Sequence, residues 1–175
     1  MELHECECNG SSSKEEAGLC VNGRDASALA TATSLNSNSG AGVMVGGPWE
    51  FQKGGEVKMQ GCACNDNKGS GLVVLSHREN VWVSVSHSRA TAIASSISSN
   101  HSDCVRACER GKIKLYDSQC NNSTNGCGWA AHSHATVILG HGCMADGNKR
   151  GQCDQSVGGK VVSDKEYQSL CCLLM

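Results

Sequence analysis

The sequence predicts an all-β chain in which short strands wind into a parallel solenoid, and two observations lead to this prediction. Residues 57–74 (VKMQGCACNDNKGSGLVV) repeat the pattern of residues 28–45 (ALATATSLNSNSGAGVMV) at a constant offset of 29 positions. Each unit also alternates apolar and polar residues on both sides of a turn rich in Asn, Gly and Ser, as expected of strands with one buried face. A repeat of this length is typical of a solenoid, in which each strand pairs with its equivalent one coil away.

The matched positions carry residue types that suit stacked corners. At the offset of 29, Asn38 falls on Asn67 and Gly42 falls on Gly71. Asn and Gly tolerate the left-handed backbone of a tight corner, so we expect both to form columns along the stack. The residues assigned to corner or stacking positions are Asn38, Asn67, Asn125, Asn148, Gly42, Gly71, Gly128, Cys64 and Cys120.

The first apolar pair of each unit gives a map of the coils. Coil starts are predicted near residues 1, 28, 57, 81, 113 and 137, with repeats over 1–160 and a cap or tail over 161–175. The fourth unit (VWVSVSHS) fits the pattern least well, and residues 163–175 are a candidate capping helix. Because terminal repeats usually differ from internal ones, a start inside the first coil is interpreted as a piece of a longer repeat protein. End-to-end stacking on further coils is the alternative.

The combined pattern Φ-x-Φ-x-x-C-x-C-N…G-x-G-Φ-x-Φ, over roughly residues 1–155, resembles a known repeat family. It is similar to the right-handed parallel β-helix, or pectin-lyase-like, family, and especially to its generic carbohydrate-binding and sugar-hydrolase repeats. The resemblance implies a right-handed parallel β-helix of about six coils. It implies little about function, because many chemistries and many plain binders share this scaffold.

Composition agrees with a narrow solenoid core and argues against several function classes. The chain of 175 residues suits one domain, and its 3% aromatic content and 21 glycines would not fill an ordinary globular core. The net charge of −2, with no basic run longer than Lys149-Arg150, argues against nucleic-acid binding. No apolar stretch is long enough for a transmembrane helix. The N-terminus lacks the apolar segment of a signal peptide, so an intracellular protein is expected.

The 13 cysteines are interpreted as structural, reduced thiols. A disulfide framework is disfavoured by the odd count and the missing signal peptide. The Cys-x-Cys pairs are expected to point both sulfurs to the same side, and a zinc site with histidines is the alternative. Interchange of these pairs with small or apolar residues favours inward stacking, so no metal and no cofactor are predicted. The proposed equivalents are Cys6/Cys8, Thr33/Leu35, Cys62/Cys64, Ser86/Ser88 and Gly142/Met144, and the histidines considered are His132 and His134.

Two motifs suggest chemistry. Gly140-His141-Gly142 resembles the Gly-His-Gly element of polygalacturonases, in which the histidine supports paired aspartates. Glycoside hydrolysis needs two carboxylates, and the family's other elements have no counterpart here, so His141 and Asp146 are weak catalytic candidates. The ending Cys172-Leu-Leu-Met, with Cys171 beside it, has the form of a prenylation signal and would give peripheral membrane contact. The alternative is an apolar tail that caps the last coil.

The sequence therefore favours a non-enzymatic scaffold or binding module for a glycan or a protein partner. Its exposed side chains would stand in columns at the inter-strand spacing of about 4.8 Å, which suits a repeating ligand. A partial or degenerate polysaccharide-active hydrolase or lyase is the first alternative. A prenylated membrane-associated adaptor is the second.

Overall fold

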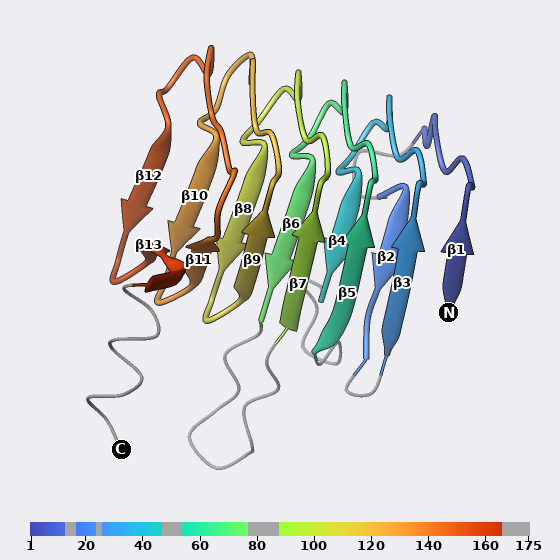
Figure 1. Cartoon of the computed structure of the whole chain (residues 1–175), viewed down its shortest axis with the longest axis horizontal. Coiled ribbons are helices and arrows are strands. Elements are labelled where there is room, and N and C mark those ends of the chain that lie inside the picture. The colour runs from blue at the N-terminus through green and yellow to red at the C-terminus, as the bar shows by residue number, and fades with distance from the viewer. Residues whose placement is uncertain (13–16, 24–25, 47–53, 77–87, 166–175) are drawn as a thin grey trace.

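The structure, a computed structural model, describes residues 1–12, 17–23, 26–46, 54–76 and 88–165, and within these ranges the chain forms two parallel β-sheets. The chain passes alternately from one sheet to the other, and each return adds a strand beside the previous strand of that sheet (Figure 1). The seven-stranded sheet contains, in spatial order, β1 (Glu2–His4), β3 (Ser27–Thr31), β5 (Gly55–Gln60), β7 (Ser88–Ile93), β9 (Lys112–Tyr116), β11 (Thr136–Leu139) and β13 (Lys160–Ser163). The six-stranded sheet contains β2 (Leu19–Val21), β4 (Val43–Val45), β6 (Leu72–Leu75), β8 (Val105–Cys108), β10 (Trp129–His132) and β12 (Cys153–Ser156).

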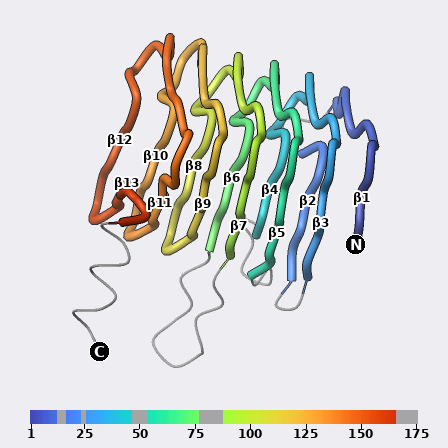
Figure 2. Tube along the Cα trace, viewed as in Figure 1, coloured from blue at the N-terminus to red at the C-terminus, as the bar shows by residue number. Residues whose placement is uncertain are grey.

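The two sheets lie along one axis, and their strands run in opposite directions. Figure 1 shows the first strand at one end of the stack and the last strands at the other. Figure 2 shows the same path as a tube, in which successive turns of the chain lie side by side. The fold therefore places equivalent residues of successive turns next to one another, as the offset of 29 predicts.

The core lies between the sheets and consists of small and medium side chains in registered columns. In β5, alternate residues are buried, and Val57 and Met59 point into the core. Val57 pairs with Ala28 on one side and Ala90 on the other, and Ala90 pairs in turn with Ile113. Burial of apolar surface stabilises each layer by about 25 cal/mol per Å². Because alanine alternates with larger residues along the column, the low aromatic content is consistent with a filled core.

A line of single β-bridges forms a third side between the two sheets. The bridged residues are Glu7, Ser34, Ala63, Ser96, Gln119 and Met144. The residue before each bridge is small and polar or a thiol, and in several coils it donates to the carbonyl oxygen two positions earlier. Thr33 Oγ1 lies 3.0 Å from the oxygen of Thr31, and Ser118 Oγ lies 2.8 Å from that of Tyr116. This shared role explains why cysteine, serine and threonine interchange here. The residues before the bridges are Cys6, Thr33, Cys62, Ser95, Ser118 and Cys143.

The bridge line corrects two of the expected equivalences. The partners of Cys62/Cys64 in the next turn of the chain are Ser95 and Ile97, and not Ser86 and Ser88. In the last turn they are Cys143 and Ala145, one residue beyond the expected Gly142 and Met144. The first shift arises because the sequence alternates both at residues 81–88 and within β7, and the bridge line follows the register of β7.

The expected coil starts can be compared with the strands of the seven-stranded sheet. Strands β1, β3, β5, β9 and β11 begin within two residues of the positions given for them. Position 81 lies outside the described residues, and the strand that pairs with β5 and β9 begins at Ser88. The sheet continues through β13 to Ser163, and most of the candidate cap, residues 166–175, lies outside the described ranges. Within those ranges, the chain has no helix of the length and apolar character that crossing a membrane requires.

Candidate functional site

The corner between each bridge and the following strand of the six-stranded sheet is built on a column of buried asparagines. Asn38 Nδ2 donates to Asn67 Oδ1 at 3.1 Å, and Asn67 Nδ2 donates to Asn100 Oδ1 at 3.0 Å. Asn100 Nδ2 closes the series on the carbonyl oxygen of Cys64 at 2.9 Å. Asn67 Oδ1 and Asn100 Oδ1 also accept from the backbone amides of Asn38 and Asn67, respectively. All three side chains are at most 1% exposed, so the ladder satisfies amide groups that would otherwise be buried without partners.

The column continues to Asn148, with a serine in the intervening coil. Asn148 Oδ1 accepts the backbone amide of Ser123 at 2.9 Å, and its Nδ2 donates to the carbonyl oxygen of Cys120 at 2.8 Å. The residue that occupies the stacking position in this coil is therefore Ser123, which is buried, whereas Asn125 is exposed two positions later. The Asn-Gly pair at 125–126 resembles a corner in sequence, and the inserted residue hides the true register.

The glycines that begin the strands of the six-stranded sheet make room for these amides. A Cβ atom on Gly42 would lie 2.9 Å from Asn67 Nδ2, and one on Gly71 would lie 2.7 Å from Asn100 Nδ2. Gly128 stands in the same relation to Asn148, at 3.1 Å. The first two distances are shorter than real Cβ atoms show and the third is tight, so glycine and asparagine positions depend on each other across coils. The recurrent pairing of Asn and Gly in the sequence follows from this contact.

The residues directly before and directly after the stacked asparagines face solvent and form two further columns. Ser37, Asp66 and Ser99 each precede a buried asparagine and have φ of 57°, 58° and 56°. This left-handed conformation turns the chain through the corner and directs these side chains outward. The column after the asparagines contains Ser39, Lys68, His101 and Thr124. Their backbone amides donate to carbonyl oxygens of the preceding coil, for example Lys68 N to Asn38 O at 2.9 Å and His101 N to Asn67 O at 2.8 Å.

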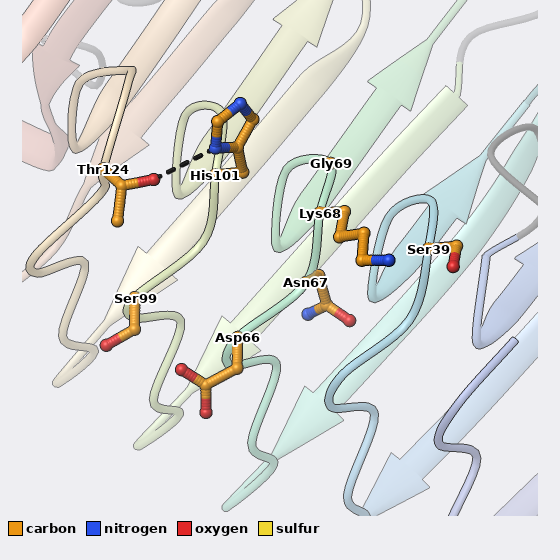
Figure 3. A pocket seen from close by; sticks show the side chains of 8 residues that line it. All are labelled: Ser39, Asp66, Asn67, Lys68, Gly69, Ser99, His101 and Thr124. Atoms are coloured by element: carbon orange, nitrogen blue, oxygen red, sulfur yellow. Dashed lines mark hydrogen bonds between the residues drawn. The ribbon is translucent and has the colours of Figure 1, made fainter. Parts of the chain in front are cut away.

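The two outward columns enclose a groove that crosses four turns of the chain, which we call the corner groove (Figure 3). Its volume is about 670 Å³, and it is open to solvent. Asn67 lies at its floor, Asp66 and Ser99 lie on one side, and Lys68 lies toward Ser39 on the other. His101 Nδ1 and Thr124 Oγ1 are 3.2 Å apart. The lining residues are Ser39, Asp66, Asn67, Lys68, Gly69, Ser99, His101 and Thr124.

An ion pair between the buried Asp103 and the partly exposed Arg106 fixes the backbone just beyond His101. Asp103 Oδ2 accepts from Arg106 Nη2 at 2.6 Å and Nε at 2.7 Å, and Oδ1 accepts from the amide of Cys127 at 2.9 Å. Burial alone would raise the pKa of Asp103, but the Cys127 amide and the Arg106 guanidinium outweigh it and hold the pKa below its usual value. The carboxylate therefore stays charged and ties two coils together beside the groove.

The cysteines assigned to stacking positions are part of the core. Cys64 and Cys120 are fully buried, and burial raises the pKa of both thiols well above the ordinary value. The 11 described cysteines are all free, and both Cys62 and Cys64 point inward. No three His, Cys, Asp or Glu side chains of the described residues lie close enough together to hold a metal ion.

The weak catalytic candidates lie at different corners. His141 follows β11, and its Nε2 lies 3.0 Å from Asp117 Oδ2 in an exposed pair, with the Tyr116 ring centroid 6.0 Å away. Asp146 lies beyond the bridge at Met144, at the asparagine corner, where its amide donates to an asparagine of the previous coil. Cys171 and Cys172 lie outside the described residues.

His132 and His134, the histidines considered for a zinc site, do not lie on one strand face. β10 ends at His132, and the backbone turns through left-handed conformations at Ser133 and His134, with φ of 53° and 63°. His132 Nδ1 lies 2.6 Å from Ser156 Oγ on β12. The sequence alone does not reveal this corner, because the segment His-Ser-His continues the alternation of the strand.

Sequence reasoning assigned Asn38, Asn67 and Asn148 to the column, but it missed Asn100 and the groove over the column. The outward residues of the columns differ from coil to coil, so no repeated residue type marks them. The signal that could have found them is position, because each lies directly before or after a residue of the buried column, which is an asparagine or Ser123. Comparisons with protein-family models, with curated proteins and with solved structures found no match to this chain.

Proposed function

We propose that the chain is a right-handed parallel β-helix of the pectin-lyase-like type and that it serves as a non-enzymatic binding module for an extended glycan. The two parallel sheets and the alternating path of the chain support the β-helix. The right hand rests on the strong preference of crossovers between parallel strands for that hand. The binding proposal rests on the corner groove.

The character of the groove favours a glycan over a protein partner. The described residues that line it offer hydroxyl groups, an amide, one carboxylate, one ammonium and one imidazole, and none of them is Phe, Tyr, Trp or Met. The cores of protein interfaces are enriched in aromatic residues and methionine and depleted in charge. A glycan instead presents a line of hydroxyl groups, which can donate to Asp66 and accept from Lys68 and His101.

The arrangement also suits a ligand with a repeat. Ser39, Lys68, His101 and Thr124 are held by backbone hydrogen bonds between successive coils, so their spacing is close to the inter-strand distance of about 4.8 Å. The column is rigid, since each member lies beside a buried residue of the ladder, which is an asparagine in three coils and Ser123 in the fourth. A preformed column avoids the entropy cost of ordering loops when a ligand binds.

A panel of immobilised neutral linear glycans tests this function with the intact chain. We expect saturable binding to at least one of them and changes in the backbone amide resonances of residues 66–69 and 99–101. The double substitution Asp66→Ala and His101→Ala should weaken that binding by roughly tenfold or more, as expected when hydrogen bonds to charged groups are lost. Gln60→Ala, an exposed change on β5 away from the groove, is the control. Equal binding by the double variant and the control would refute the assignment.

The pair formed by His141 and Asp117 supports a second candidate, a partial polysaccharide-active enzyme. A carboxylate 3.0 Å from an imidazole can orient it as a general base. We would then expect hydrolase or lyase activity on a polysaccharide panel, lost in Asp117→Asn and His141→Ala. Activity that survives both changes, or no activity in the parent chain, would exclude this role for the pair.

A further inference from the structure

The outer face of the seven-stranded sheet carries a cluster of cationic side chains that is separate from the corner groove. Arg89 on β7 is the register partner of Lys112 on β9, and Thr91 is the partner of Lys114. Lys58 on β5 pairs with Thr91 from the other side. The Thr91 hydroxyl therefore lies among four cationic residues contributed by three strands. We call Arg89, Thr91, Lys112 and Lys114 the cationic cluster.

This arrangement brings like charges close together in one sheet. Residues directly opposite each other in a sheet have Cβ atoms about 5 Å apart, and like charges at such positions are destabilising. Arg89 and Lys112 occupy such a pair. Within strands β5, β7 and β9 the one acidic residue is Glu56, the partner of Arg89, and its carboxylate lies 3.7 Å from Lys58 Nζ.

A hollow of about 230 Å³ lies over these residues. It is lined by Glu56, Arg89, Ala90, Thr91, Lys112 and Lys114. Lys112 and Lys114 are half-buried, so their charges are less screened than those of fully exposed lysines. The hollow therefore combines space for a small group with a concentrated positive potential.

We propose that the cationic cluster binds a phosphate or sulfate ester group. Such a group carries one or two negative charges and three acceptor oxygens, which match the guanidinium fork of Arg89, the ammonium groups of Lys112 and Lys114, and the Thr91 hydroxyl. A carboxylate offers one charge and two oxygens and would leave part of the cluster unmatched. Glu56 bounds the site on the β5 side, because it repels an anion placed over that strand.

Two sources could supply this chemistry, a soluble phosphate or sulfate ester and the phosphomonoester headgroup of a lipid. Titration of the full chain with inorganic phosphate tests the shared chemistry. We expect saturable shifts of the β7 and β9 backbone amides, without shifts at the corner groove. Arg89→Gln and Lys114→Gln should each weaken phosphate binding by roughly tenfold. Arg110→Gln, which removes an exposed positive charge at another corner, is the matched control and should bind phosphate like the parent chain.

Binding to lipid vesicles distinguishes a lipid headgroup from a soluble ester. Stronger flotation with phosphatidylcholine vesicles that contain phosphatidate than with charge-matched phosphatidylserine vesicles, reversed by free phosphate, would assign a lipid headgroup. Saturable phosphate shifts with no vesicle binding would assign a soluble ester. A weak site with a Kd of about 1 mM would be almost fully occupied at about 20 mM phosphate. The proposal is therefore wrong if no saturable shift occurs below that concentration. It is equally wrong if acetate produces the same shifts, or if Arg89→Gln binds phosphate as tightly as Arg110→Gln. Loss of glycan binding in groove variants leaves these readouts unchanged, so the two proposals fail independently.

Discussion

Replacement of Asn67 by alanine tests how much the asparagine ladder contributes to stability. The side chain of Asn67 takes part in three hydrogen bonds: its oxygen accepts from the backbone amide of Asn38 at 2.9 Å and from Asn38 Nδ2 at 3.1 Å, and its Nδ2 donates to Asn100 Oδ1 at 3.0 Å. Each such bond contributes about 1 kcal/mol net, and a buried donor left without a partner costs about 1–3 kcal/mol. We therefore expect Asn67→Ala to lower the free energy of unfolding by about 3–5 kcal/mol.

A loss of this size is a large part of the 5–15 kcal/mol that stabilises a typical domain. The measurement is urea unfolding followed by far-ultraviolet circular dichroism, in which the midpoint should fall while the dependence on urea stays the same. Asn125→Ala is the matched control, because that asparagine is exposed and lies outside the column. We expect it to change stability by no more than about 0.5 kcal/mol.

Asn67→Asp adds a sharper test, because it keeps the shape of the side chain but replaces a donor by an acceptor. The new carboxylate oxygen would face Asn100 Oδ1 without a hydrogen at neutral pH, so this variant should be less stable at pH 7 than when its carboxyl is protonated. The reasoning is refuted if Asn67→Ala costs less than about 1 kcal/mol, or if it costs no more than the Asn125 control.

Three further predictions follow from the corners and the core. Gly71→Ala should destabilise the chain by about 2 kcal/mol or more in the same assay, because its Cβ would overlap the amide of the next coil; unchanged stability would contradict that contact. Burial would raise the pKa of Asp103, but the Cys127 amide and Arg106 lower it in the folded state. The contribution of Asp103 to the free energy of unfolding is therefore present above its unfolded pKa of about 3.8 and is lost as pH falls through the lower folded value. Asp103→Asn should therefore be less stable at pH 7 and show a smaller loss of stability on acidification, and an unchanged acid-dependent loss would count against the pair. Finally, Cys20 is exposed and Cys64 is buried with a raised pKa, so a thiol-alkylating reagent should modify Cys20 in the folded chain and Cys64 only after unfolding, as peptide mass spectrometry can show.

The parts of the fold that repeat residue types could be predicted from the sequence. The contact between Asn38 and Asn67 follows from the offset of 29, because equivalent positions of adjacent coils lie side by side and two buried amides there can bond to each other. Alternation predicted the strands that contain Val57 and Ile113 for the same reason. These features are local or exactly periodic, and so a single sequence carries them.

Features that depend on insertions or on contacts between unlike residues could not be predicted. The alternating segment at Val81 lies outside the described residues, and the strand that pairs with β5 and β9 begins at Ser88. Alternation by itself does not distinguish between two such segments. Ser123 replaces asparagine in the ladder because a hydroxyl-bearing residue can follow the same corner. The cationic cluster combines Arg89 of β7 with Lys112 and Lys114 of β9, which lie more than 20 positions later, so no continuous basic segment of the sequence indicates it.

The amide ladder also has a consequence for how such a chain can change in length. Asn67 accepts from Asn38 through its oxygen and donates to Asn100 through its Nδ2, so a whole coil inserted between Asn38 and Asn67, with an asparagine at this position, could make the same bonds on both sides. A gain or loss of one residue within the Asn-x-Asn triplet would instead leave an amide facing the wrong group. Genes of this kind should therefore tolerate duplication of complete coils, and shorter insertions should gather in the connections that lie away from the ladder.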